Sequence, residues 1–65
     1  MSNVLLKETI EKSDLRPEYF AAALDISLKT WREKVEGVSE FKVSEVKKLI
    51  DVLGLTQAQA YKVFF

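Results

Sequence analysis

The chain of 65 residues contains no cysteine, no histidine, a single proline and two glycines. Without cysteine the fold has no disulfide, and without cysteine or histidine it lacks the usual ligands of a zinc site. A serine nucleophile activated by a histidine base is excluded for the same reason. No apolar run approaches the roughly 18 residues of a membrane span, and the first residues lack a signal-peptide pattern. We therefore expect a cytoplasmic, non-enzymatic protein without metal, cofactor or membrane contact.

The chain also has no net charge, because ten basic residues balance ten acidic ones. Nucleic-acid-binding domains usually carry a basic surplus. A neutral total can still conceal a basic face, so the distribution of charge decides more than its sum. A chain of this length forms one domain, here taken as residues 1–65, and the hydrophobic fraction of 48% must supply the whole core.

Apolar residues recur at spacings of three and four, whereas no segment alternates with the period of two expected for a strand. This spacing predicts five short helices over residues 3–13, 17–24, 28–36, 43–53 and 57–64. In the last of them, Ala60, Tyr61 and Phe64 are expected to point inward. On the first helix, Lys7 and Glu11 are spaced to pair across one turn.

Residues that favour helix ends support these boundaries. Pro17 suits the first turn of a helix, and Asp25 can adopt the left-handed backbone that ends one. Ser27 is a good N-cap, and Thr56 with Gln59 forms the pattern of a capping box. Five short helices with tight connections favour an all-α orthogonal bundle over an up-down bundle, whose helices would be longer.

The segment over residues 20–37 carries the functional signal. Two short helices meet at Asp25-Ile26-Ser27, with the small Ala21 facing inward on the first helix and Trp31 anchoring the second. Such a turn of three or four residues is typical of a helix-turn-helix, whose second helix enters the major groove of DNA.

The chain resembles the lambda-repressor-like helix-turn-helix domains of the Cro/CI and XRE type, and among them the small Cro-like regulators of phages. The similarity covers residues 15–65 and is carried by the segments 20–31, 34–37, 41–42, 44–46 and 46–55. It implies the lambda-repressor-like arrangement of the five helices and a sequence-specific transcriptional regulator that binds operator DNA.

The chain departs from the family pattern in four ways, of which the missing basic surplus is one. Asp25 stands where a glycine is usual in the turn, and Trp31 replaces an inward aliphatic residue. Arg16-Pro17-Glu18 occupies the region where the family often has a phosphate-contacting glutamine.

Carried over by position, the resemblance implies DNA contacts by Ser27, Leu28, Lys29, Thr30, Arg32 and Glu33. The side-chain chemistry agrees with this set, because lysine and arginine donate to guanine, glutamate accepts from cytosine, and Leu28 or Thr30 suits a thymine methyl. Ser27 at the helix start can hold a phosphate. Arg16 and Lys42 would flank the face and contact only the DNA backbone, while Lys34 adds to its positive charge.

Two functions remain open from the sequence. The first is a DNA-binding regulator that acts as a dimer. The second is a protein-interaction module of the same fold that binds another regulator, which the zero net charge favours. The C-terminal aromatic residues leave a similar choice, because Phe64 and Phe65 either both fold back into the core or form a homodimer contact.

Overall fold

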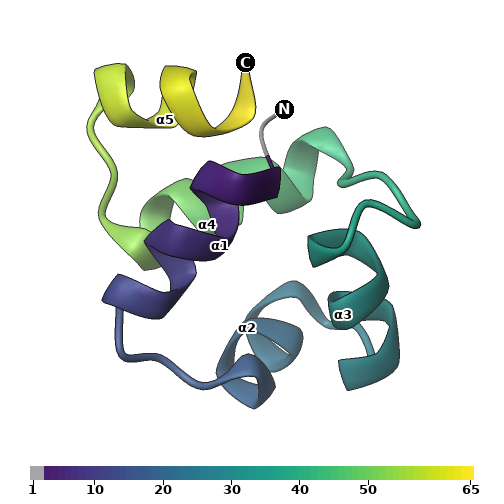
Figure 1. The fold of residues 1–65 in the computed structure, drawn as a ribbon. Helices are drawn as coiled ribbons and strands as arrows, with labels where there is room; N and C mark the ends of the chain where they lie inside the picture. Colours follow the sequence, from purple (N-terminus) through teal and green to yellow (C-terminus); the bar gives the residue numbers. More distant parts are fainter. Residues whose placement is uncertain (1–2) are drawn as a thin grey trace.

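The computed structural model in Figure 1 describes residues 3–65 of the chain. Its five helices are α1 (Asn3–Lys12), α2 (Pro17–Leu24), α3 (Leu28–Val35), α4 (Val43–Leu53) and α5 (Gln57–Phe64). Residues 3–65 include no strand, which confirms the all-helical class. The predicted bounds of α2, α4 and α5 are confirmed, while α1 and α3 each end one residue earlier than predicted.

Aspartate residues end the first two helices. Asp14 follows α1 with a φ of 60°, and Asp25 follows α2 with a φ of 56° and a ψ of 46°. The Asp25 amide donates to the Ala22 carbonyl, and the next amide, of Ile26, donates to the Ala21 carbonyl at 3.0 Å. The predicted left-handed stop at Asp25 is therefore confirmed.

The starts of α4 and α5 are each closed by a side chain three residues into the helix. The predicted capping box of α5 is confirmed, because Gln59 Oε1 accepts from the Thr56 amide at 2.9 Å and Thr56 Oγ1 accepts from the Gln59 amide at 3.2 Å. At α4, Glu45 Oε1 accepts from the Lys42 amide at 2.8 Å. That second closure was not predicted, because lysine is not a usual N-cap.

The core is built around three side chains with no exposed surface, Leu6 on α1, Phe20 on α2 and Leu49 on α4. Trp31 on α3 is 3% exposed and stacks on Phe20, with 4.9 Å between the ring centroids and 9° between the planes. Helix α2 contacts α3 and α4, and helix α1 contacts α3 and α5. The predicted burial of Trp31 is therefore confirmed, and its ring joins α3 to α2.

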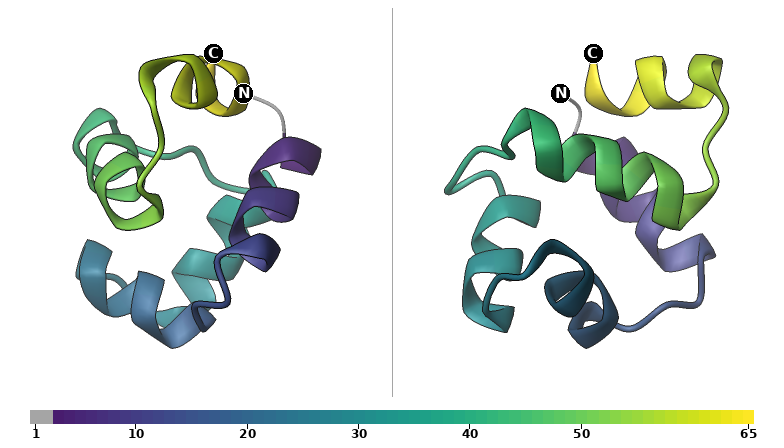
Figure 2. Two further views of the ribbon diagram at one scale, coloured as in Figure 1. Left: turned by 90° about the vertical axis from the view of Figure 1, so that its left-hand side faces the viewer. Right: turned by 180° about the vertical axis from the view of Figure 1, so that it is seen from behind.

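The helices occupy two regions of the molecule. Both views of Figure 2 place α5 at one end, lying over α1 and α4, and α2 at the other end with α3 beside it. The longest dimension of the molecule is 29 Å. No helix within residues 3–65 is long and apolar enough to cross a membrane.

The expectation that Tyr61 points inward was wrong, and of the two alternatives for the C-terminal aromatic residues, the return of both Phe64 and Phe65 to the core is excluded. Tyr61 and Phe65 are 69% and 78% exposed, because α5 presents Ala60, Val63 and Phe64 to the core instead. Tyr61 and Phe65 lie one turn apart outside that face, with their ring centroids 6.1 Å apart. Phe64 alone therefore returns to the core.

Lys7 also has a different partner from the one expected. Its ammonium bonds the Glu36 carboxylate at the end of α3, at 2.9 Å, and not Glu11 on its own helix. This ion pair links α1 to α3 at the surface of the molecule.

Candidate nucleic-acid interface

Helices α2 and α3 are joined by three residues, Asp25, Ile26 and Ser27. Ile26 packs against the core, which holds the turn to the body of the molecule. Ser27 Oγ accepts from the Thr30 amide at 3.1 Å and donates to Thr30 Oγ1 at 2.8 Å. The start of α3 is thus capped by Ser27 as predicted, while Trp31 fixes its inner face.

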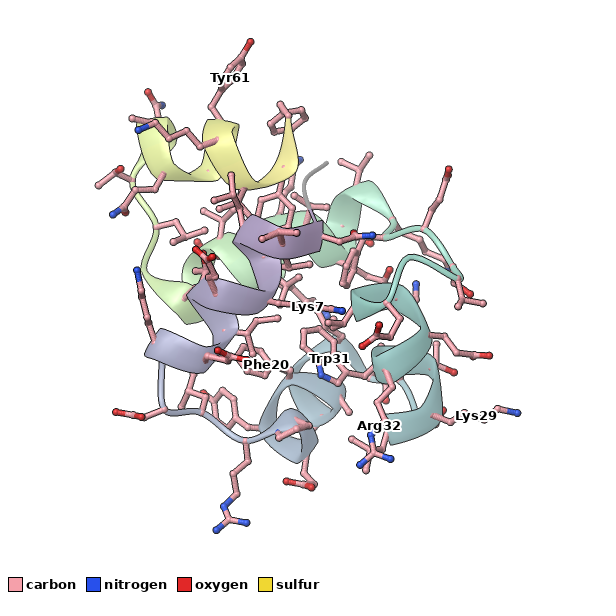
Figure 3. The ribbon with its side chains drawn as sticks, viewed as in Figure 1. Lys7, Phe20, Lys29, Trp31, Arg32 and Tyr61 are labelled. Atoms are coloured by element: carbon pink, nitrogen blue, oxygen red, sulfur yellow. The ribbon has the colours of Figure 1, made fainter. Side chains whose placement is uncertain are left out.

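Lys29 and Arg32 lie on the outer side of α3, one turn apart, and both are exposed. Figure 3 shows them extending into solvent, whereas Trp31 of the same helix points toward Phe20. Within residues 3–65 neither side chain has an ion-pair or hydrogen-bond partner. Their cationic groups are therefore free to contact an external anion or acceptor.

The remaining candidate residues of α3 are less exposed. Leu28 is half-buried and packs against the core, so only part of its side chain can reach an external surface. Thr30 and Glu33 are also half-buried. The hydroxyl of Thr30 is already engaged by Ser27, which leaves its methyl group as the part suited to an external contact.

The two flanking candidates each precede a helix. Arg16 lies directly before α2 with an extended backbone, and Lys42 lies directly before α4 in the same conformation. Both are exposed. A basic side chain directly before a helix N-terminus adds its own charge to the positive end of the helix dipole, and both features favour a bound phosphate.

Lys34 does not contribute to the exposed positive charge as the sequence suggested. Its side chain is 7% exposed, and its ammonium forms an ion pair with Glu45, whose side chain is 8% exposed. The ammonium also donates to the Glu40 carbonyl at 3.3 Å and lies 5.9 Å from the centroid of the Phe41 ring. The free cations of α3 are thus Lys29 and Arg32.

The environment of Glu45 keeps its carboxylate ionised. Burial raises the pKa of Glu45, but hydrogen bonds from the Lys34 ammonium and the Lys42 amide, together with the charges of both lysines, outweigh this effect. The net result is a pKa below the ordinary value. The Glu45 carboxylate is therefore ionised at neutral pH.

Sequence reasoning missed both members of this pair. The spacing of Lys42 and Glu45 contains the weak signal that was available, because a glutamate three residues into a helix often bonds the amide that precedes it. No local pattern indicates that Lys34 reaches the same carboxylate, since it lies eleven positions away on another helix.

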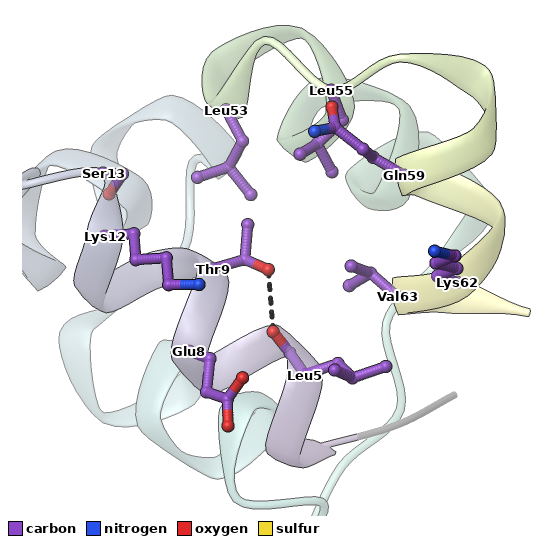
Figure 4. Close-up of a pocket in the computed structure, with 10 residues that line it drawn as sticks. All are labelled: Leu5, Glu8, Thr9, Lys12, Ser13, Leu53, Leu55, Gln59, Lys62 and Val63. Atoms are coloured by element: carbon purple, nitrogen blue, oxygen red, sulfur yellow. Dashed lines mark hydrogen bonds between the residues drawn. The ribbon is translucent and has the colours of Figure 1, made fainter.

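Two of the three hollows described within residues 3–65 border α1 on different sides. One of about 240 Å³ lies among α1, α2 and α3, next to Arg32, with Ile10, Trp31 and Val35 in its lining. The other, of about 380 Å³, is shown in Figure 4 and lies between α1, the end of α4 and α5. Arg32 borders the first of them and Lys29 borders neither, so the surface of α3 around Lys29 is convex and not part of a cleft.

A convex helix with free cations fits a groove in a partner better than it fits a small ligand. Among residues 3–65, no group of three or more acidic residues is placed to hold a metal ion. Comparison of the chain with protein families, with curated proteins and with solved structures found no match.

Proposed function

We propose that this chain is a sequence-specific, double-stranded-DNA-binding transcriptional regulator of the phage Cro-like kind, in which α2 and α3 act as a helix-turn-helix. The observation that carries the proposal is the state of α3: its inner face is fixed by Trp31, while Lys29 and Arg32 on its outer side have no partner within residues 3–65. An α-helix fits the major groove of B-DNA, where lysine and arginine donate to guanine edges. Such a regulator acts in the cytoplasm, where bacterial DNA lies.

The other candidate residues take supporting roles in this proposal. Glu33 accepts from a cytosine amino group, and the Thr30 methyl or the exposed part of Leu28 meets a thymine methyl. Arg16, Lys42 and the Ser27-capped start of α3 contact phosphates, which orients the helix without selecting sequence. Each role matches the exposure that the side chain has in the structure.

The charge balance favours modest affinity for random DNA. The ion pair with Glu45 withdraws Lys34 from the surface, and the pair with Glu36 neutralises Lys7 beside α3. Non-specific affinity depends on the number of phosphates neutralised by cations. We therefore expect weak binding to random duplex DNA, with the preference for a particular site supplied by Lys29 and Arg32.

The test is selection of preferred duplexes from a random pool at low salt, followed by gel shift of the selected site. The double variant Lys29→Ala/Arg32→Ala should lose the shifted band while its unfolding transition stays unchanged. Lys47→Ala/Lys48→Ala is the matched control, because it removes the same charge from exposed positions of α4 and should retain the band. Equal loss in both variants, or no binding by the unaltered chain, would contradict the proposal.

A second candidate function is supported by two exposed aromatic residues, Tyr61 on α5 and Phe65 directly after it. Tyr61 and Phe65 form a pair on the outside of the molecule, and Tyr61 lies at the end opposite to Lys29 and Arg32 (Figure 3). We propose a protein contact at this pair, either with a second copy of the chain or with a partner regulator. Binding there leaves α3 uncovered.

Sedimentation velocity over a range of concentrations tests the second copy as the occupant of this surface. The expected result is reversible self-association that Tyr61→Ala/Phe65→Ala abolishes without changing stability. A monomer at every concentration would rule out the homodimer, and capture of a regulator that fails with the double variant would then identify the partner.

A further inference from the structure

The carboxylate of Glu45 connects two elements that the proposed function uses. Its Oε1 atom accepts from the Lys34 ammonium on α3 and from the Lys42 amide at the start of α4. Lys29 and Arg32 lie on the first of these elements, and the Lys42 side chain belongs to the second. One buried oxygen therefore joins the base-contacting helix to a phosphate-contacting residue.

We propose that Glu45, acting through Lys34, is a positioning residue that sets the placement of α3 relative to Lys42 and so contributes to DNA sequence selectivity. This inference rests on the proposed function. It assigns a role to two residues that the set of DNA contacts does not include.

The surroundings of Lys34 and Glu45 make the bond between them sensitive to distance and angle. Both side chains are more than nine-tenths buried, so water does not replace either partner. The ammonium is also bonded to the Glu40 carbonyl and faces the Phe41 ring, which meets Trp31 edge-on at 5.9 Å between centroids. Hydrogen bonds to charged groups in such sites require closely defined distances and angles, whereas apolar contacts tolerate sliding.

Few side-chain hydrogen bonds connect α3 to α4 within residues 3–65. The seven residues 36–42 form an irregular segment between α3 and α4. Within residues 3–65, Lys34 makes the side-chain hydrogen bonds that run from α3 to this segment and to α4. If they are removed, α3 keeps its stacking on Phe20 but loses its polar attachment to α4.

The informative variant is the double substitution Lys34→Met/Glu45→Gln. Glu45→Gln alone would leave a buried ammonium without a counter-charge, which often unfolds a small domain. The double variant removes both charges, keeps an amide oxygen to accept from the Lys42 amide, and keeps an unbranched side chain at position 34. Lys7→Met is the control, because it removes an exposed ion pair to Glu36, the residue directly after α3.

Geometry is measured first, independently of DNA. Because the chain has no cysteine, spin labels can be attached at Lys29→Cys and Lys42→Cys alone. We expect the distribution of label distances to broaden in the Lys34→Met/Glu45→Gln background and to stay unchanged in the Lys7→Met background. An unchanged distribution in the double variant, with the fold intact, would overturn the inference.

DNA selectivity is measured second, on chains without labels, as the ratio of affinities for the selected site and for random duplex. The double variant should lose about tenfold in this ratio, the size expected when one base contact is weakened. Its binding to random duplex should be unchanged, since all proposed DNA-contacting cations remain. If the ratio of affinities in the double variant stays within about twofold of that of the original chain, Lys34 and Glu45 contribute to stability only and not to selectivity.

The two measurements separate the inference from the proposed function. If the unaltered chain binds no duplex DNA, the proposed function fails, while broadening of the label distances still establishes that the pair positions α3. If DNA binds and the distances do not broaden, the proposed function stands and the positioning role fails.

Discussion

The indole of Trp31 lies flat against the ring of Phe20, with 9° between the two planes, and this contact joins α3 to α2. Both side chains are buried, and Phe20 has no exposed surface at all. Phe20 also meets Tyr19 edge-on, and Trp31 meets Phe41. The orientation of the proposed DNA-contacting helix is therefore fixed from its inner side by an aromatic cluster.

Replacing this indole tests how much of the stability the cluster supplies. We expect Trp31→Ala to lower the free energy of unfolding by about 3–5 kcal/mol, the usual cost of removing a buried aromatic ring. Trp31→Phe retains a stacked ring and should cost clearly less. The measurement is urea unfolding followed by far-ultraviolet circular dichroism, since the chain has no other tryptophan to report by fluorescence.

An exposed aromatic residue provides the comparison for this prediction. Tyr61→Ala removes a ring that is 69% exposed and should change the free energy of unfolding by less than about 0.5 kcal/mol. Equal effects at Trp31 and Tyr61 would mean that the stacked pair is not the anchor of α3.

Asp25 offers a prediction of the opposite sign. Its φ of 56° is a left-handed conformation that a residue with a Cβ adopts at a cost. Asp25→Gly removes that cost but gives the unfolded chain more freedom, so we expect a change between zero and about 1 kcal/mol of stabilisation. Asp25→Val should instead destabilise by more than about 1 kcal/mol, because a β-branched residue tolerates this conformation poorly. Thermal unfolding of the two variants side by side would decide the sign.

The acid limb of the stability profile should depend on Glu45. Burial raises the pKa of Glu45, but the hydrogen bonds and charges of Lys34 and Lys42 lower it by more than burial raises it. The Glu45 carboxylate therefore binds a proton less readily in the folded chain than in the unfolded chain. The stabilisation is complete above the ordinary pKa of about 4.5 and is lost as the pH falls through the lower value of the folded state.

Urea unfolding at several pH values between roughly 3 and 7 measures this effect. The double variant Lys34→Met/Glu45→Gln, which keeps no charge at this buried site, should lose less stability on acidification than the original chain. Lys34→Met, which removes the main source of the lowered pKa, should also show a shallower acid limb. Parallel profiles for all three proteins would show that Glu45 does not govern acid unfolding.

The sequence was sufficient for features that depend on near neighbours. The Thr56–Gln59 capping box, the Ser27 cap and the left-handed Asp25 each follow from one residue and its immediate surroundings, and all three are confirmed. The burial of Trp31 also follows from helical spacing. In contrast, the spacing in α5 did not distinguish Tyr61 from Val63, because which of the two is covered depends on how α5 lies over α1 and α4.

Partners that are distant in the chain were beyond sequence reasoning. Lys7 meets Glu36 from 29 positions away, and Lys34 meets Glu45 from 11 positions away. Exposed lysines and buried lysines look alike in a sequence, since burial of an ammonium depends on a carboxylate supplied by another element. For this reason the sequence alone overstates the exposed positive charge of α3 by one cation, Lys34.

Salt dependence separates the two groups of proposed DNA contacts. Arg16 and Lys42 are assigned to phosphates, whereas Lys29 and Arg32 are assigned to bases. Each phosphate contact adds about 0.9 to the steepness with which the logarithm of affinity falls with the logarithm of salt concentration. Removing a phosphate contact therefore weakens all sequences alike and lowers that slope by about one, whereas removing a base contact reduces selectivity.

We expect Arg16→Ala and Lys42→Ala each to lower the slope by about one and to leave the preference for the selected site unchanged. Arg32→Ala should instead reduce that preference by about 1–3 kcal/mol, with a smaller effect on the slope. The measurement is affinity for selected and random duplexes at four or more salt concentrations. A loss of preference in Arg16→Ala, or an unaltered preference in Arg32→Ala, would show that α3 does not lie in the groove in the proposed orientation.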